Sequence, residues 1–276
     1  MSNPILSFAC TALAFCAIAC GQKTYAEKAT EFVAQEPETP AFSQTAAVDA
    51  GHAEVDLSHI ENGVIAMKPS GKEFVRVTIA KDGKEVLYDL PASRDTVYYP
   101  LNMGDGIYRV KVLEHLEGNM YLPVWDEEIE VKIPDERDPF RYASQVVPYN
   151  TDSACVAKAK EIVQGCRDDR EAVMAICRYV HRTIAYDQAK ADKPLMFHGW
   201  HPDRTLYLGS GICGDRAALA GAMCRSVGIP CKVVTGNMPL GFHAWISVYI
   251  EDVGWRSIDP GWERAITKEY EAITEY

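Results

Sequence analysis

The sequence has no lysine- or arginine-rich patch, no internal repeat, and no apolar run after its first twenty residues that could span a bilayer. Its 28 Lys and Arg against 39 Asp and Glu give a net charge of −11, which argues against a nucleic-acid partner. It also lacks a CxxC motif and any His, Cys and carboxylate cluster at metal spacing. We therefore predict neither a metal nor another cofactor. Its 276 residues, 47% hydrophobic, suffice for one large domain or two smaller ones.

The first twenty residues resemble a bacterial export signal. Ile5 to Ala19 is an uncharged run rich in Ala, Leu and Phe that is too short for a membrane-spanning helix. It ends in Ala17-Ile18-Ala19-Cys20-Gly21, which is similar to the lipobox of bacterial lipoproteins. That resemblance implies a lipid on Cys20 and the membrane as a partner. We expect an exported protein, either lipid-anchored in the cell envelope or secreted. The alternatives to a lipoprotein signal are a simple signal peptide and a disordered apolar start.

Composition and periodicity divide the rest of the chain into three parts. Residues 21–53 are rich in Ala, Glu, Thr and Pro without periodicity, which predicts a disordered linker. Residues 54–134 alternate apolar and polar side chains between Gly-containing turns, which predicts a small antiparallel immunoglobulin-like β-sandwich. A polar break at Pro134–Pro139 then opens a second domain over residues 135–276, where the apolar spacing becomes that of helices.

Helix signals dominate the start of this second domain. A cap at Asp152-Ser153 is expected to begin one helix, and Asp168 with Glu171 forms a capping box for the next. Residues 186–208 make a connection that is long for a compact domain, and we expect it to line a site. Residues 236–242 are predicted to be a loop between two strands.

Six cysteines follow the export signal, and an exported location permits disulfides. If Cys213 stays free, the other five allow at most two bridges. Sequence spacing favours two local pairs, Cys155 with Cys166 and Cys224 with Cys231. The connectivity is not deducible from the sequence alone.

The stretch Gly209–Leu219 contains the main catalytic candidate. Its glycines favour a turn just before Cys213, and the residues that follow predict a helix with Cys213 in its first turn. The free N–H groups and the positive end of the helix dipole favour the thiolate, which is the nucleophilic form. A single cysteine is more often a small buried hydrophobe. A catalytic interpretation therefore requires a base.

Two later strands supply that base. Residues 243–250 and 254–259 are predicted to form an antiparallel hairpin, so the start of the first strand and the end of the second share one edge. His243 and Asp259 are therefore expected to be neighbours, with Cys213 facing them from the helix. Such a group can act as nucleophile, general base and orienting carboxylate.

Four fragments in this order resemble the core of the transglutaminase-like superfamily, over about residues 140–262. They are Gly211-Ile212-Cys213-x-Asp215-x-Ala217, Arg225-Ser226-x-Gly228-Ile229-Pro230, His243-Ala244-Trp245 and Gly254-Trp255-x-x-x-Asp259-Pro260. The resemblance implies an α+β, papain-type catalytic core behind the sandwich. It also implies that Cys213 is the nucleophile, His243 the general base and acid, and Asp259 the orienting carboxylate.

Three positions depart from the family pattern. Gly214 and Arg216 stand where aromatic or bulkier residues are common, and Gly261 stands where Thr is frequent. Asp215 matches the family. We expect Asp215 to hold the helix start, because an unpaired carboxylate beside the thiolate would raise the pKa of the thiol.

The resemblance implies acyl transfer from a glutamine side-chain amide or a peptide bond, through a thioester on Cys213, to an amine or to water. The backbone N–H of Cys213 or Gly214 would stabilise the oxyanion, with Trp200 and Tyr207 as candidate second donors. Trp245 is a further candidate at the substrate site. The expected substrate is an envelope or extracellular protein or peptide. The alternative is a catalytically silent binding or scaffold module of the cell envelope.

Overall fold

The computed structural model describes residues 31–71, 75–92, 95–193, 199–239, 241–262, 264–265 and 270–276. The predicted export signal, including Cys20, lies outside these residues. The elements in chain order are β1 (Ala47–Asp49), β2 (Ala53–Asp56), η1 (Ile60–Asn62), β3 (Val64–Pro69), β4 (Val75–Lys81), β5 (Lys84–Leu90), β6 (Val97–Pro100), β7 (Gly106–Glu117), β8 (Met120–Val131), η2 (Asp138–Phe140), α1 (Ala154–Ile162), α2 (Asp169–Thr183), β9 (Ala185–Tyr186), α3 (Gln188–Ala191), α4 (Pro202–Leu208), β10 (Ser210–Gly211), α5 (Cys213–Ser226), β11 (Cys231–Met238), β12 (Gly241–Ile250), β13 (Gly254–Asp259), β14 (Arg264–Ala265) and β15 (Glu271–Glu275). No helix within the described ranges is long and apolar enough to cross a membrane.

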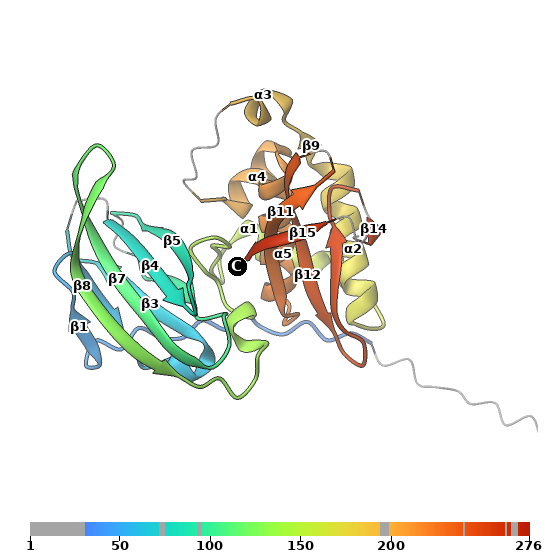
Figure 1. Ribbon diagram of the computed structural model, residues 1–276. Coiled ribbons are helices and arrows are strands. Elements are labelled where there is room, and N and C mark those ends of the chain that lie inside the picture. The colour runs from blue at the N-terminus through green and yellow to red at the C-terminus, as the bar shows by residue number, and fades with distance from the viewer. Residues whose placement is uncertain are drawn as a thin grey trace, which may run out of the picture.

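The first half of the chain forms two four-stranded antiparallel sheets, ordered β1-β2-β3-β6 and β5-β4-β7-β8 (Figure 1). Because side chains alternate across a strand, one set from each sheet points inward. Val77 and Ile79 of β4 and Ile65 and Met67 of β3 are buried and belong to one hydrophobic cluster. The antiparallel strands predicted for residues 54–134 are confirmed.

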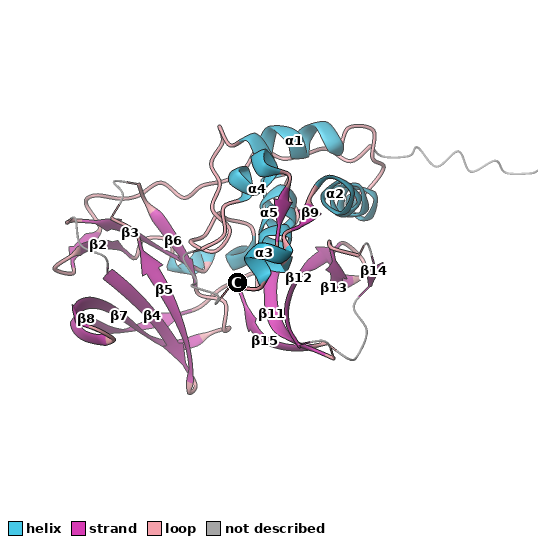
Figure 2. Ribbon diagram, turned by 90° about the horizontal axis from the view of Figure 1, so that it is seen from above, coloured by secondary structure: helices cyan, strands magenta, loops and turns pink. Residues whose placement is uncertain are grey.

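The second half of the chain is α+β. Its five-stranded sheet has the order β14-β13-β12-β11-β15, and Figure 2 shows helices stacked over one face of it. Helix α5 lies at the centre, against α1, α2 and α4 as well as β11 and β12. Every residue in Gly214–Ser226 is buried. Small residues make this close packing feasible, since a Cβ on Gly221 would lie 2.9 Å from the Val233 side chain.

Arg225 is fully enclosed near the end of α5 but is well satisfied. Its guanidinium donates to the carbonyl oxygens of Cys231 (2.7 Å), Tyr142 (2.9 Å) and Tyr276 (2.7 Å). These acceptors belong to β11, to the segment before α1 and to the chain after β15. Hydrogen bonding of this kind offsets the cost of burying a charge, so Arg225 stabilises the junction of these segments.

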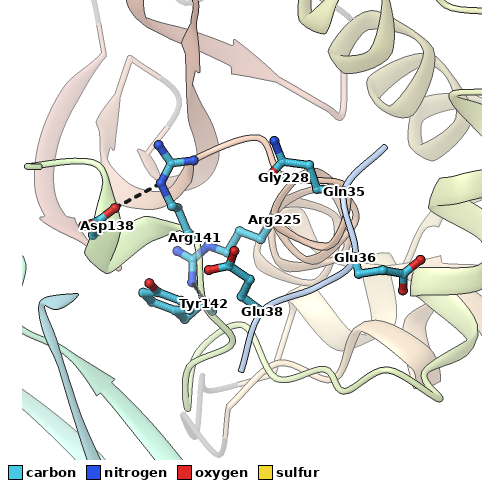
Figure 3. A pocket seen from close by; sticks show the side chains of 8 residues that line it. All are labelled: Gln35, Glu36, Glu38, Asp138, Arg141, Tyr142, Arg225 and Gly228. Carbon is cyan, nitrogen blue, oxygen red and sulfur yellow. Dashed lines mark hydrogen bonds and ion pairs between the residues drawn. The ribbon is translucent and has the colours of Figure 1, made fainter. Parts of the chain in front are cut away.

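The described part of the expected linker does not match a disordered chain. Phe32 N–H donates to the Cys166 carbonyl (2.8 Å) and Gln35 N–H to the Val227 carbonyl (3.2 Å), so this segment lies along the second domain. Figure 3 shows Gln35 beside Gly228 at the end of α5. A Cβ on Gly228 would come within 2.7 Å of the Gln35 carboxamide carbon. β1 and the start of β2 also precede residue 54, where the first domain was expected to begin.

Helix α1 is capped from another helix instead of by Asp152-Ser153. Asp203 of α4 accepts hydrogen bonds from the N–H groups of Ala154 (3.2 Å) and Cys155 (2.8 Å). The Ser153 side chain makes no capping bond to the helix. The predicted start of α2 is confirmed, because the Asp168 carboxylate accepts from the N–H at position 171 (2.8 Å).

Two connections predicted as loops contain regular structure. The segment 186–208 includes α3, capped by the Asp187 carboxylate, and α4, which has Pro202 at its first position. The segment 236–242 belongs largely to strands, because β11 continues to Met238 and β12 begins at Gly241. Local capping and strand pairing extend these elements beyond what composition predicts.

The six cysteines of the described chain are free thiols, so neither favoured disulfide is present. Cys155 lies against Asp203 instead of Cys166, and burial together with this carboxylate raises the pKa of its thiol. Cys224 and Cys231 are neighbours, as the spacing suggested. A hydrogen bond with Cys231, together with burial, raises the pKa of the Cys224 thiol.

Candidate active site

Two glycines shape the turn that presents Cys213. Gly209 ends α4 in the left-handed conformation (φ +61°). Gly211 leaves room for the Asp215 side chain, because a Cβ added at position 211 would lie only 2.6 Å from the Cβ of Asp215. Strand β10 pairs in parallel with β9, so Gly211 lies opposite Tyr186. Cys213 is then the first residue of α5, as predicted, where backbone N–H groups have no acceptor inside the helix.

Asp215 holds this helix start. Its Oδ2 accepts a hydrogen bond from the N–H of Ile212 (2.9 Å), and Lys190 Nζ pairs with the same oxygen at 2.6 Å. The Asp215 side chain is only 5% exposed. Because its charge is paired with a cation, the carboxylate can stand close to the thiol without strongly opposing a thiolate. This is the structural role expected for Asp215.

The predicted hairpin of β12 and β13 brings His243 and Asp259 together. Ile246 pairs with Ile258 in the register, which places the start of β12 beside the end of β13. His243 Nε2 donates to Asp259 Oδ2 at 2.7 Å, and Asp259 Oδ1 accepts from the N–H of Gly261, also at 2.7 Å. The Asp259 side chain is 2% exposed. Both carboxylate oxygens are therefore held, and the imidazole plane is oriented by one of them.

The side chain of Cys213 also interacts with this imidazole. Burial lowers the pKa of His243, but hydrogen bonds with Asp259 and Cys213 outweigh burial and raise it to about 9. Since Nε2 is bonded to Asp259, Nδ1 is the nitrogen that remains for the thiol. The imidazole can take the thiol proton and keep it near neutral pH. The arrangement is thus suited to a thiolate–imidazolium pair.

Three aromatic rings surround His243. Trp245 is stacked beneath it with ring centroids 6.4 Å apart, while Trp262 lies at 6.0 Å and Tyr270 at 5.9 Å. Trp245 was a candidate from the sequence, but the other two were missed. Trp262 follows the Asp-Pro-Gly turn directly and could have been noticed for that reason. Tyr270 lies beyond the predicted strands, where no sequence pattern pointed to the site.

Trp200 fills the space that a side chain at position 214 would occupy. A Cβ on Gly214 would overlap the indole ring of Trp200. The indole of Trp200, from the loop before α4, therefore occupies the place of a side chain at position 214. Tyr207, the other candidate from that loop, is 88% exposed on α4. The described contacts do not bring Tyr207 to Cys213.

Replacing Gly214 with alanine should displace Trp200. We expect the free energy of unfolding to fall by about 1–3 kcal/mol, because the added methyl group has no space beside the indole. The measurement is urea unfolding of the single variants G214A and W200A and of the double variant. The double variant should lose less than the sum of the single losses, because removing the indole makes room for the methyl group. Additive losses would contradict this account of the position.

Comparison with known proteins identifies a sequence family for the segment that contains these residues. Residues 156–260 match the sequence pattern of the Transglutaminase-like superfamily, and this range contains Cys213, His243 and Asp259. These residues belong to this superfamily. An uncharacterized protein of Mycobacterium leprae is 27% identical over 172 residues, and the match covers 58% of each chain. The present chain therefore spans little more than half the length of that relative.

Solved structures resemble the chain more loosely. A candidate cysteine protease from Cytophaga hutchinsonii gives a TM-score of 0.45 at 14% identity, over 77% of this chain and 79% of that one. Red sea bream transglutaminase gives 0.32 at 15% identity, over 71% and 47%. These superpositions are partial. The assignment of the transglutaminase-like domain rests on the sequence match.

Proposed function

We propose that this protein is an exported cysteine-dependent acyltransferase or hydrolase that acts through a thioester. Its substrates would be glutamine side-chain amides or peptide bonds of envelope or extracellular proteins and peptides. One observation carries the proposal: His243 Nε2 donates to Asp259 Oδ2 at 2.7 Å, and Cys213 is near enough to the same imidazole to help raise its pKa. A histidine that is held by a buried carboxylate near a thiol is the arrangement that cysteine acyl transfer needs.

The reaction would proceed in two stages. His243 takes the thiol proton, and the Cys213 thiolate attacks the acyl carbon. His243 then protonates the leaving ammonia or amine as the carbon–nitrogen bond breaks, which leaves a thioester. In the second stage His243 removes a proton from an amine or water, which attacks the thioester and releases the thiolate. Asp259 keeps the imidazole in the correct tautomer and stabilises the imidazolium throughout.

The developing oxyanion would be stabilised at the start of α5. The N–H groups of Cys213 and Gly214 lie in the first helical turn, where the helix offers them no acceptor. Such groups, together with the helix dipole, favour negative charge in a site that excludes water. The indole of Trp200, which packs on Gly214, is the candidate for a side-chain donor.

The remaining parts of the chain would place this chemistry outside the cytoplasm. We propose that residues 1–20 direct export and that Cys20 carries a lipid that binds the membrane. We also propose that the two-sheet domain is an immunoglobulin-like spacer or binding module, which its antiparallel strand order supports. Expressed with its leader in a bacterial host, the protein should partition into detergent phase, and Cys20→Ala should not. Equal partitioning of the two proteins would refute the lipid anchor.

The activity can be tested with glutamine-containing peptides, with and without a primary amine, and mass spectrometry of the products. Amine adducts would indicate acyl transfer, whereas glutamate or cleaved peptide would indicate hydrolysis. C213A is the control and should form neither product. No turnover by the wild type on a peptide library, with equal partner binding by C213A, would instead support the binding or scaffold module.

A further inference from the structure

Arg216 is an arginine at an unusual place beside the proposed active site. It stands three residues after Cys213 in α5, so the two side chains lie on the same face of the helix. The side chain is almost fully enclosed, with 9% of the residue exposed. The Nη2 group donates to the carbonyl of Ile184. A cation on the same helical face as the proposed nucleophile favours the thiolate form of that nucleophile, because a buried charge is weakly screened by solvent.

The guanidinium is poorly satisfied compared with that of Arg225. Its buried Nε has no hydrogen-bond partner among the described residues, and they provide no direct ion pair to the group. By contrast, three carbonyl oxygens surround the Arg225 guanidinium. An unpaired buried donor destabilises the folded protein. Packing alone therefore gives a weak reason for an arginine at position 216.

The negative groups near Arg216 are those of the proposed active site. A Cβ on Gly261 would lie 3.0 Å from Asp259 Oδ1 and 3.3 Å from Arg216 Nη1, so one small gap separates the carboxylate from the guanidinium. Gly261, which departs from the family pattern, leaves that gap open. Burial lowers the pKa of Arg216, and the charges of Asp259 and Cys213 oppose this shift.

The other groups around Arg216 do not replace Asp259 and Cys213 as its partners. The Arg216 guanidinium carbon lies 5.5 Å from the ring centroid of Tyr186. The titratable groups that neighbouring elements bring to this region are His181 of α2, Tyr186 of β9, His243 of β12, Asp259 of β13, and the paired Lys190 and Asp215 at the start of α5. Among them, His181 contacts the Gly261 carbonyl. Of these, only Asp259 carries a negative charge not already paired with a lysine or arginine.

We propose that Arg216 is a positioning residue that acts through Cys213 and Asp259: its fixed positive charge stabilises the thiolate of the first and the ionised carboxylate of the second. This inference rests on the proposed function, because it assigns Arg216 a task in the same reaction. Removing the charge should make the thiolate harder to form. The pH at which Cys213 becomes reactive should therefore rise.

The test is the pH dependence of iodoacetamide alkylation at Cys213, resolved by peptide mass mapping. R216M removes the charge and keeps most of the side-chain length, whereas R216K keeps a charge. R256M is the matched control, because Arg256 is an exposed residue on β13, the strand that carries Asp259. We expect R216M to raise the alkylation midpoint by roughly one pH unit, and R216K and R256M to shift it by less than about 0.3.

The outcomes separate this inference from the proposed function. If wild-type Cys213 is more reactive than in urea-unfolded protein but R216M has the wild-type midpoint, the role of Arg216 is wrong and the proposed function stands. A loss of rate at every pH without a change of midpoint indicates a packing role and also overturns it. If wild-type Cys213 reacts no faster than when unfolded, both fail. Should R216M lack the wild-type circular dichroism spectrum, R216Q takes its place under the same criteria.

Discussion

Cys213→Ala should abolish acyl transfer and hydrolysis, with a loss of at least about 10⁴-fold in turnover. The reason is that Cys213 is the thiol that interacts with the imidazole of His243 and would be deprotonated by it. The measurement is product formation from the peptide substrate identified by mass spectrometry. Cys166→Ala is the matched control, because Cys166 is a partly exposed free thiol in the connection between α1 and α2. Turnover retained by Cys213→Ala would assign the chemistry to another residue.

Asp259→Asn should have the second largest effect, a fall in kcat/KM of about 10²- to 10⁴-fold. The amide leaves the hairpin packed but removes the charge that fixes the tautomer and stabilises the imidazolium. Since hydrogen bonding to Asp259 helps raise the pKa of His243 to about 9, its loss lowers that pKa. The pH–rate profile of each protein, measured from pH 5 to 10, tests this.

The direction of the pH change follows from the role of His243 as the acid. In the wild type the imidazolium is present below about pH 9, so activity should fall as pH rises through that value. In D259N the falling limb should move to lower pH. Asp252→Asn, in the exposed turn between β12 and β13, should keep the wild-type profile. A D259N profile that is reduced in height but unshifted would contradict the proposed role of Asp259.

Features set by local periodicity were predictable from the sequence. Alternation over residues 54–134 predicted the strands because each sheet buries one face. The pairing of His243 with Asp259 was also predictable, because a short turn fixes which residues of an antiparallel hairpin share an edge. The position of Cys213 followed from glycines before a helix of small residues. These inferences need only local chain geometry.

Features set by contacts between distant segments were not predictable in the same way. The Asp203 carboxylate that caps α1 and the Trp200 ring on Gly214 both come from segments without periodicity. Residues 32–35 lie in a segment whose overall composition predicts a disordered linker, yet Phe32 and Gln35 form backbone hydrogen bonds to the second domain. Tyr270 reaches His243 through a chain segment next to β15, which no sequence pattern indicated. Such contacts depend on the assembled fold.

The most direct test of the central claim, that His243 and Asp259 activate Cys213 as a nucleophile, needs no knowledge of the substrate. It is the site-resolved rate of Cys213 alkylation at pH 6, compared among native wild type, native H243A and urea-unfolded protein. The account predicts that native Cys213 reacts at least about 10-fold faster than the unfolded thiol and that H243A loses this advantage. A native rate equal to that of the unfolded thiol would contradict the account.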